Sequence, residues 1–248
     1  NPGTGLPSDL WLPSTSLIPP EEAQQFSTRL NYIWNKDCIS FISAYYKRFE
    51  NLIEYRSAFP LYNPVINQST VLPIFNNSRD WEDRVEIGNG SAYGVDFFTA
   101  YTTQRWNTSI SYNFGVSTRQ FENINKGEPF PFKYDRRHDI SITGNYKLSE
   151  RSRLGANWVY GTGHATTFAT SAFRGVDGEL ILDFSSRNNF RLPAYHRLDI
   201  SFNYIKPLTQ KLDLEVTAGL YNAYNRLNPY YVYLYSDQDG EQFTPRQV

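Results

Sequence analysis

The chain has 248 residues and a formal net charge of −1, so it lacks the basic excess that attracts nucleic acids, and we expect no nucleic-acid partner. Its one cysteine, Cys38, excludes an internal disulfide framework and any zinc site built on paired cysteines. No run approaches the ~18 consecutive apolar residues of a membrane helix, while aromatic residues make up 17% of the chain. This composition favours amphipathic strands, and a membrane-spanning form would have to be a barrel.

Alternating residues predict four strands in the first half of the chain, at residues 25–34, 39–49, 93–103 and 106–116. The last of these is the clearest, because mostly apolar or aromatic residues at even positions alternate with small polar residues at odd ones. Its length matches the ~9 to 11 residues that a tilted strand needs to cross a bilayer. We therefore expect strands with one apolar and one polar face.

The second half predicts four more strands, at residues 138–148, 153–160, 195–204 and 212–224. Two of them share a pattern, since YDRRHDISITGNY (134–146) and YHRLDISFNY (195–204) both place arginine and aspartate beside an alternating run. Apolar residues break the predicted polar face at three positions, Ile33, Phe98 and Val159.

Short and long connections alternate along this pattern. The short ones lie at 35–37, 104–105, 149–150 and 206–210, and the long ones at 50–90, 119–136 and 161–193. A soluble sandwich has no reason to sort its loops in this way, whereas an outer-membrane barrel keeps short turns on the periplasmic side and long loops outside. We therefore predict an antiparallel transmembrane β-barrel segment. Residues 1–22 would be an extracellular loop, 23–224 strands and loops, and 225–248 the last extracellular loop, with a final strand and the start of the protein expected in a longer precursor.

Several stretches, in this order and spacing, resemble the last third of the β-barrel of TonB-dependent outer-membrane receptors. They are GTGLPSDLWLPST, AYYKRFENLIEYR, GNGSAYGVDFF, KGEPFPFKYDRRHDISITGNYKL, WVYGTG, RNNFRLPAYHRLDISFNY and LYNAYNRLNPYYVYL. The likeness is to the Bacteroidetes-type branch with a carboxypeptidase-regulatory-like N-terminal domain. It implies eight strands of a 22-stranded barrel and import of a scarce nutrient such as a siderophore, cofactor or glycan. The plug domain and the TonB contact would belong to the parent protein.

Three sets of residues are candidate sites. Charges expected to line the lumen as a ladder across facing strands, or to contact plug or ligand, are Arg137, Asp139, Arg197 and Asp199. Aromatic residues expected in belts at the lipid headgroups are Tyr93, Tyr101, Trp106, Tyr146, Trp158, Tyr160 and Tyr204. Loop aromatics that are candidate ligand contacts, with packing between loops as the alternative, are Trp81, Phe130, Phe132, Tyr134 and Tyr230.

No nucleophile with a base, paired-carboxylate cleft or phosphate-binding glycine loop occurs in the sequence, so we expect no enzyme activity, no cofactor and no metal site. The expected partners are membrane lipid and lipopolysaccharide, a small-molecule or glycan ligand, and TonB and the plug through the parent protein. Two alternatives remain open at this point. One is a soluble all-β carbohydrate-binding module, and the other is a passive or structural outer-membrane barrel without energy coupling.

Overall fold

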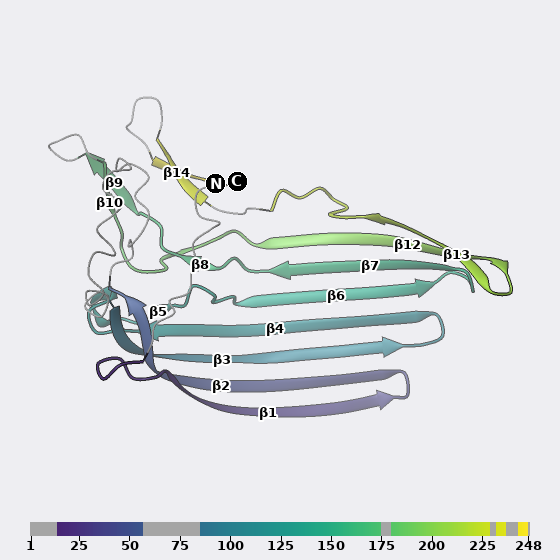
Figure 1. The fold of residues 1–248 in the computed structure, drawn as a ribbon, viewed down its shortest axis with the longest axis horizontal. Coiled ribbons are helices and arrows are strands. Elements are labelled where there is room, and N and C mark those ends of the chain that lie inside the picture. Colours follow the sequence, from purple (N-terminus) through teal and green to yellow (C-terminus); the bar gives the residue numbers. More distant parts are fainter. Residues whose placement is uncertain (1–13, 57–84, 175–179, 229–231, 237–242, 248) are drawn as a thin grey trace.

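The computed structural model describes residues 14–56, 85–174, 180–228, 232–236 and 243–247, and every structural statement below concerns these residues. The long strands form one antiparallel sheet in which each pairs with the next long strand along the sequence (Figure 1). Its eight long strands are β1 (Glu22–Asn35), β2 (Cys38–Tyr55), β3 (Val85–Thr102), β4 (Trp106–Gln120), β6 (His138–Lys147), β7 (Ser152–Gly161), β12 (Tyr195–Thr209) and β13 (Leu212–Leu220). The prediction of an antiparallel all-β fold is confirmed, and the sheet is open, with β1 and β13 at its two edges.

Several of these strands are longer than predicted, and the largest extensions are those of β2 and β3. Residues 50–55 and 85–90 continue β2 and β3, although the alternation placed them in a loop. The cause is a bulge: Asn51 has a φ of 57°, and the pairing register shifts between Phe49 and Leu52. A bulge adds one residue to one strand and so interrupts the period of two. The pairing resumes with Leu52 opposite Gly88.

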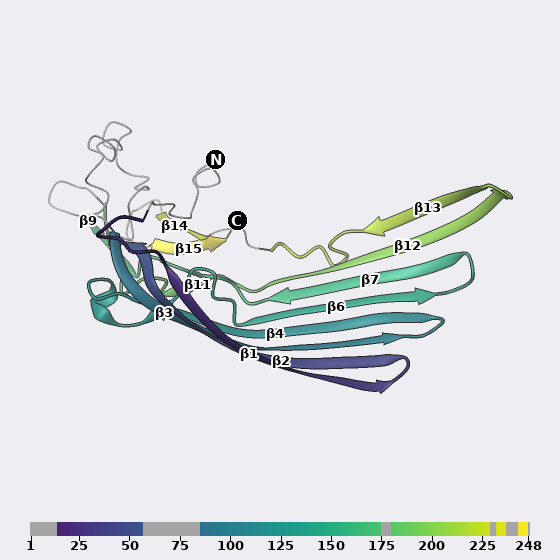
Figure 2. The ribbon, with the colours of Figure 1, turned by 60° about the horizontal axis from the view of Figure 1, so that its bottom comes forward.

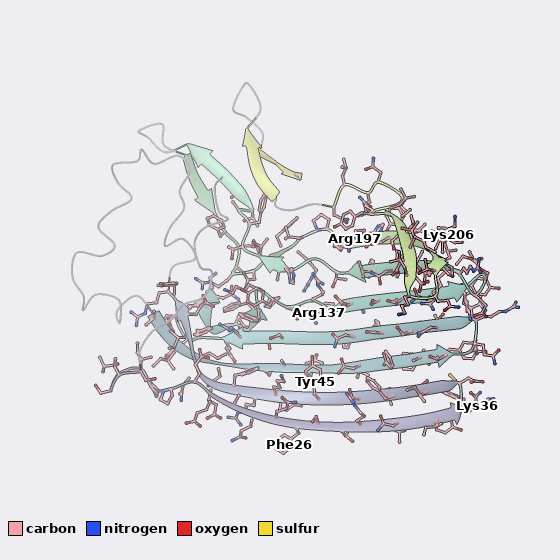
Figure 3. All side chains as sticks on the ribbon, turned by 45° about the vertical axis from the view of Figure 1, so that its right-hand side comes forward. Phe26, Lys36, Tyr45, Arg137, Arg197 and Lys206 are labelled. Atoms are coloured by element: carbon pink, nitrogen blue, oxygen red, sulfur yellow. The ribbon has the colours of Figure 1, made fainter. Side chains whose placement is uncertain are left out.

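The sheet has a turn end and a loop end (Figure 1). The turn end carries the connections 36–37, 103–105, 148–151 and 210–211, and Lys36 and Lys206 lie there (Figure 3). At the 36–37 turn the Asp37 amide donates to Asn35 Oδ1 at 2.8 Å, the side-chain bond by which Asn stabilises a tight turn. The turn predicted at 206–210 is shorter, because β12 continues through Pro207 with a register shift before Thr209.

The loop end carries the long connections and several small elements (Figure 2). The β4–β6 loop, residues 121–137, contains the 3-10 turn η2 (Asn125–Gly127) and β5 (Phe130–Pro131), which pairs with β4. The β7–β12 loop, residues 162–194, and the C-terminal residues contain three short pairs: β8 (Ala165–Thr166) with β11 (Phe190–Arg191), β9 (Ser171–Arg174) with β10 (Leu180–Asp183), and β14 (Val232–Ser236) with β15 (Phe243–Gln247). Within the described ranges no helix has the length and apolarity to cross a membrane.

The two faces of the sheet differ in chemistry, and the difference is the same on each successive strand. Residues that follow one another across six strands on one face, here called the apolar face, are Leu30, Ile42, Phe97, Tyr112, Ile140 and Tyr160. The adjacent row on the other face, here called the polar face, is Arg29, Ser43, Asp96, Asn113 and Asp139. Leu30 is 67% exposed and Phe97 39%, so the chain itself leaves the apolar face uncovered. A continuous exposed apolar surface of this kind indicates contact with lipid or another protein.

Candidate functional site

The β4–β6 loop folds back over the polar face at the loop end. Gly88 of β3 points to the same face as Asp96, and a Cβ added there would lie 2.3 Å from the Phe121 ring. The absence of a side chain at this position therefore lets the Phe121 ring approach the strand closely. The loop core so formed consists of Leu52, Phe121, Ile124 and Phe130, with Phe49 packed against it. Phe121 and Phe130 are 1% and 2% exposed, which makes this one of the best-buried parts of the described chain.

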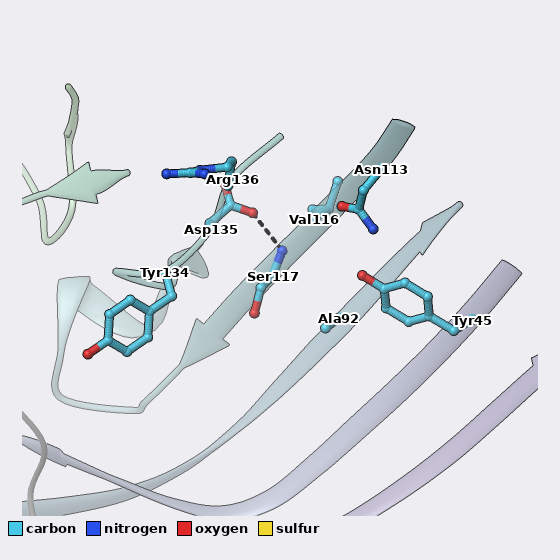
Figure 4. A pocket seen from close by; sticks show the side chains of 9 residues that line it. Tyr45, Ala92, Asn113, Val116, Ser117, Tyr134, Asp135 and Arg136 are labelled. Atoms are coloured by element: carbon cyan, nitrogen blue, oxygen red, sulfur yellow. Dashed lines mark hydrogen bonds between the residues drawn. The ribbon is translucent and has the colours of Figure 1, made fainter. Parts of the chain in front are cut away.

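Asp135 joins three segments of the chain through one buried carboxylate. Its side chain is fully buried and accepts from Arg137 Nε at 2.9 Å and from Arg191 Nη2 at 2.5 Å. The Ser117 amide of β4 donates to Asp135 Oδ1 at 2.7 Å (Figure 4). Arg191 also donates through Nη1 to the backbone oxygens of Asp135 at 2.7 Å and Gly163 at 2.9 Å. A buried carboxylate is stable only with such partners, so the two arginines and the amide hold it in place.

Two acidic residues face each other at the loop end of β2 and β3, where Glu54 is directly opposite Glu86 in the pairing register. Like charges in this position are destabilising unless they are compensated. Glu54 forms ion pairs with Arg187 at 3.1 Å and Arg119 at 3.4 Å, so it joins β4 to the β7–β12 loop. Burial lowers the pKa of Arg187, and the negative charge of Glu54 opposes this effect.

Glu86 is tied to the β4–β6 loop. Its Oε1 accepts from the backbone amide of Asn123 at 2.6 Å and from the Asn123 side chain at 3.0 Å. Its Oε2 is buried without a hydrogen-bond donor among the described residues, and Arg56 Nε lies 3.9 Å away. The negative charge of Glu86 is therefore compensated mainly by hydrogen bonds from the β4–β6 loop.

A hollow of about 200 Å³ opens beside Asp135 (Figure 4). Tyr45, Asn113, Tyr134 and Arg136 contribute to its lining. The Tyr45 ring lies over Gly94, where an added Cβ would be 2.7 Å from its hydroxyl oxygen. The hollow thus combines aromatic surface with hydroxyl, amide and guanidinium groups, which can contact a polar ligand with an apolar face.

The four charges predicted to form a ladder are balanced within their own segments. Asp139 accepts from Arg136 Nη1 at 2.7 Å, Arg137 pairs with Asp135, and Arg197 pairs with Asp199 at 2.9 Å. This differs from the ladder across facing strands, because β7 separates β6 from β12 and places Gly161 and Asn157 opposite the two aspartates. Figure 3 shows Arg137 and Arg197 displaced from the turn end toward the loop end.

The aromatic candidates divide by their location. By strand register, those predicted for the lipid belts all lie on the apolar face: Tyr93, Tyr101, Trp106, Tyr146, Trp158, Tyr160 and Tyr204. Among the ligand candidates, Phe130 is buried in the loop core, which leaves it little surface for a ligand. The ring centroid of Phe132 lies 3.7 Å from the guanidinium carbon of Arg119. Tyr134 packs edge-on against the Phe132 ring and is 52% exposed. Trp81 and Tyr230 lie outside the described residues.

The three histidines lie in separate places. His138 and His196 each share a hydrogen bond with a tyrosine hydroxyl, at 2.9 and 2.7 Å, while His164 Nε2 accepts from Arg136 at 3.1 Å. Burial lowers the pKa of His164, and the nearby positive charges of Arg136 and Arg191 lower it further. Within the part of the chain that the structure describes, no group of three or more His, Cys, Asp or Glu could hold a metal ion.

Sequence reasoning missed the residues that organise the loop end, namely Asp135, Arg191, Glu54 and Glu86. Their partners are far away in the sequence: Arg191 is 56 positions from Asp135, and Arg119 is 65 positions from Glu54. One local signal was present, since Asp135 directly precedes two arginines in YDRRH. An acid beside two cations at the start of a strand is a candidate for a buried ion pair.

Comparisons with known proteins agree with the fold. The family model for the TonB dependent receptor-like β-barrel matches residues 7–223. No curated protein matches the chain. Among solved structures, the ferripyoverdine receptor of the Pseudomonas aeruginosa outer membrane aligns with a TM-score of 0.55 at 12% identity, covering 98% of this chain and 28% of the receptor.

Two further solved structures show the same fold. The ferric-catecholate import receptor Fiu of E. coli K12 aligns with a TM-score of 0.51 at 15% identity, over 92% of this chain and 26% of Fiu. The FrpB iron transporter of Neisseria meningitidis gives 0.50 at 12% identity, over 84% and 28%. The chain thus spans about a quarter of each receptor, as an open part of the barrel. The match to the family model over most of its length shows that the chain belongs to the β-barrel family of TonB-dependent receptors.

Proposed function

We propose that the chain is part of an outer-membrane receptor that binds a scarce nutrient and imports it with energy from the inner membrane through TonB. The observation that carries this proposal is the sheet with two chemically distinct faces and sorted connections, found in a member of this family. On this proposal the apolar face contacts lipid, the polar face lines the lumen, and the loop end lies outside the cell. The protein acts as a transport receptor and has no enzyme activity.

The polar face supports the lumenal assignment. Asp96 accepts from Ser43 Oγ at 3.0 Å and also from the Asn113 side chain, so polar groups bridge three neighbouring strands. A second hollow of about 390 Å³, lined in part by Arg29, Tyr45 and Asp96, lies on the same face. In lipid such groups would be costly, whereas a lumen that contains water or a plug domain solvates or pairs them.

The ligand class remains part of the proposal: a siderophore, a cofactor or a glycan. The three solved relatives carry iron or ferric ligands in their names, which favours an iron complex as the first probe. Tyr134, the hollow beside Asp135 and the charges near it are the proposed ligand contacts in this chain. The plug and the inner-membrane contact are proposed for the complete protein.

Uptake by the complete receptor tests this function. The receptor is expressed in a bacterial host that lacks its own iron receptors, and uptake of radiolabelled ferric siderophores, cobalamin and oligosaccharides is measured with and without a protonophore. Uptake of one compound that requires both the receptor and the proton gradient supports the proposal. Uptake that needs the receptor but survives the protonophore would show the passive barrel instead. The matched control is the receptor with its TonB-contacting segment deleted.

A further inference from the structure

The two long loops that meet at the loop end are joined more tightly than surface loops usually are. Loops tend to be mobile and to open independently of the sheet below them. Here Asp135 of the β4–β6 loop and Arg191 of the β7–β12 loop form an ion pair at 2.5 Å, and Arg191 Nη1 also donates to the Asp135 backbone oxygen at 2.7 Å. Asn188 adds a bond from its side-chain nitrogen to the backbone oxygen of Pro131 at 2.7 Å.

The joined loops also rest on the sheet at two points. Ser117 of β4 donates its amide to Asp135, and Phe132 donates its own amide back to the Ser117 oxygen at 2.9 Å. At the second point Glu54 of β2 pairs with Arg187 of the β7–β12 loop. Because Arg119 of β4 also pairs with Glu54, the contacts form a closed circuit of β4, the first loop, the second loop and β2.

We propose that Asp135 and Arg191 are positioning residues that fix the two loops as one rigid ledge over the polar face. Tyr134 lies next to Asp135 in the sequence and is exposed at the edge of this ledge, beside the hollow. A ligand that moves Tyr134 must then also displace Arg191 and the second loop. This last role rests on the proposed function, whereas the mechanical coupling of the loops does not.

The chemistry explains why this pair couples the loops. The guanidinium of Arg191 alone donates to three oxygens: the Asp135 carboxylate, the Asp135 backbone oxygen and the Gly163 backbone oxygen. Removal of Arg191 takes one of three donors from a fully buried carboxylate, since only Arg137 and the Ser117 amide would remain. The loss of such a charge-assisted bond is more costly than the loss of one exposed hydrogen bond. The other charged groups here are Arg136, Arg137 and Asp139, and they remain paired or bonded if Arg191 is lost.

Hydrogen exchange of the complete receptor in detergent micelles, without ligand, tests the coupling. Arg191→Met removes the donors and keeps the length of the side chain. We expect exchange to accelerate about ten- to a hundredfold both in residues 162–171 and, across the pair, at the Ser117 amide and residues 132–137. Acceleration confined to the β7–β12 loop would overturn the proposal, because the loops would then open independently.

Two further variants separate coupling from general destabilisation. Asp135→Asn should accelerate the same two regions, and the double variant with Arg191→Met should exchange no faster than either single one, since both changes break one unit. Additive effects would contradict the ledge. Glu150→Gln is the matched control, because it removes an acid that pairs with Lys147 at the turn end and is 89% exposed. It should leave exchange at the loop end unchanged.

A conservative change guards against a variant that fails to fold. Arg191→Lys keeps the charge, but one ammonium group cannot reproduce the planar fork that reaches three oxygens. Arg191→Lys should accelerate hydrogen exchange in the same residues of both loops, but by a smaller factor than Arg191→Met. Wild-type exchange in both Arg191→Lys and Arg191→Met would overturn the proposal. Because no ligand is present, failure here leaves the uptake test untouched, and failure of uptake leaves this test untouched.

Discussion

The turn end and the loop end of the sheet contain similar ion pairs that differ in their surroundings. At the turn end Lys147 and Glu150 are 2.6 Å apart, but Glu150 is 89% exposed, and water and ions screen such a pair. At the loop end Arg137 and Arg191 meet an Asp135 side chain that is fully buried. Most of the tertiary structure within the described residues therefore lies at the loop end. The strands below it have two exposed faces and need surroundings that the rest of a barrel and the membrane would supply.

The largest expected effect concerns the loop core. Phe121→Ala removes a ring that is 1% exposed and leaves a cavity against Gly88, so the β4–β6 loop should lose about 3–5 kcal/mol of local stability. Hydrogen exchange of residues 121–132 in the complete receptor measures this loss. Leu227→Ala is the control, because Leu227 is 90% exposed. Equal exchange rates of residues 121–132 in the two variants would show that the loop core does not stabilise the loop end.

The next effect depends on which face of the sheet carries the substitution. Ile142 and Ser141 are neighbours in β6 on opposite faces. Ile142→Arg should cost about 2–4 kcal/mol if the apolar face contacts lipid near the bilayer centre, whereas Ser141→Arg should be tolerated by a lumen. The assembled fraction of the complete receptor in membranes, read from its heat-modifiable band on a gel, measures the difference. A larger loss with Ser141→Arg would reverse the assignment of the faces.

A smaller effect is expected at the glycine below the loop core. An added Cβ at Gly88 would lie 2.3 Å from both the Gln120 oxygen and the Phe121 ring, so Gly88→Ala should destabilise the loop by about 1–3 kcal/mol. Gly144→Ala is matched to it, since the Cβ there would meet Thr108 at an ordinary 3.7 Å. Exchange rates of residues 118–124 distinguish them. Identical rates in the two variants would show that the loop does not depend on this contact.

The smallest effect is a pH dependence of the loop end. The pKa of His164 is lowered from its ordinary 6.5, chiefly by burial and then by Arg136 and Arg191, so the folded loop binds a proton less readily than the unfolded chain. Its contribution is therefore complete above about pH 6.5 and is lost as the pH falls from there through the lowered pKa. Limited proteolysis of the complete receptor between roughly pH 7.5 and pH 5 should show faster cleavage near residues 162–171 at the acidic end. His164→Gln should abolish this pH step.

The alternation of residues was sufficient to predict the eight long strands and the sorting of their connections, because side-chain period and turn length are local properties. Local pattern failed at Asn51, where a bulge shifts the period, and strand residues 50–55 were assigned to a loop. It also failed at Asp135, since the partner Arg191 lies in another loop. Phe130 illustrates the same limit: its residue type fitted either a ligand contact or packing between loops, and only the fold shows that it is buried.

The most direct test of the central claim is the solvent exposure of two adjacent positions of β4, Tyr112 on the apolar face and Asn113 on the polar face. A nitroxide label is placed at each in turn in the complete receptor in liposomes, with Cys38 replaced by serine, and its collision rates with oxygen and with a water-soluble nickel complex are measured. We expect the label at 112 to collide mainly with oxygen, because oxygen concentrates in lipid. We expect the label at 113 to collide mainly with the water-soluble nickel complex. Equal rates at the two positions, or the reverse order, would contradict a sheet with one face in lipid and the other in a lumen.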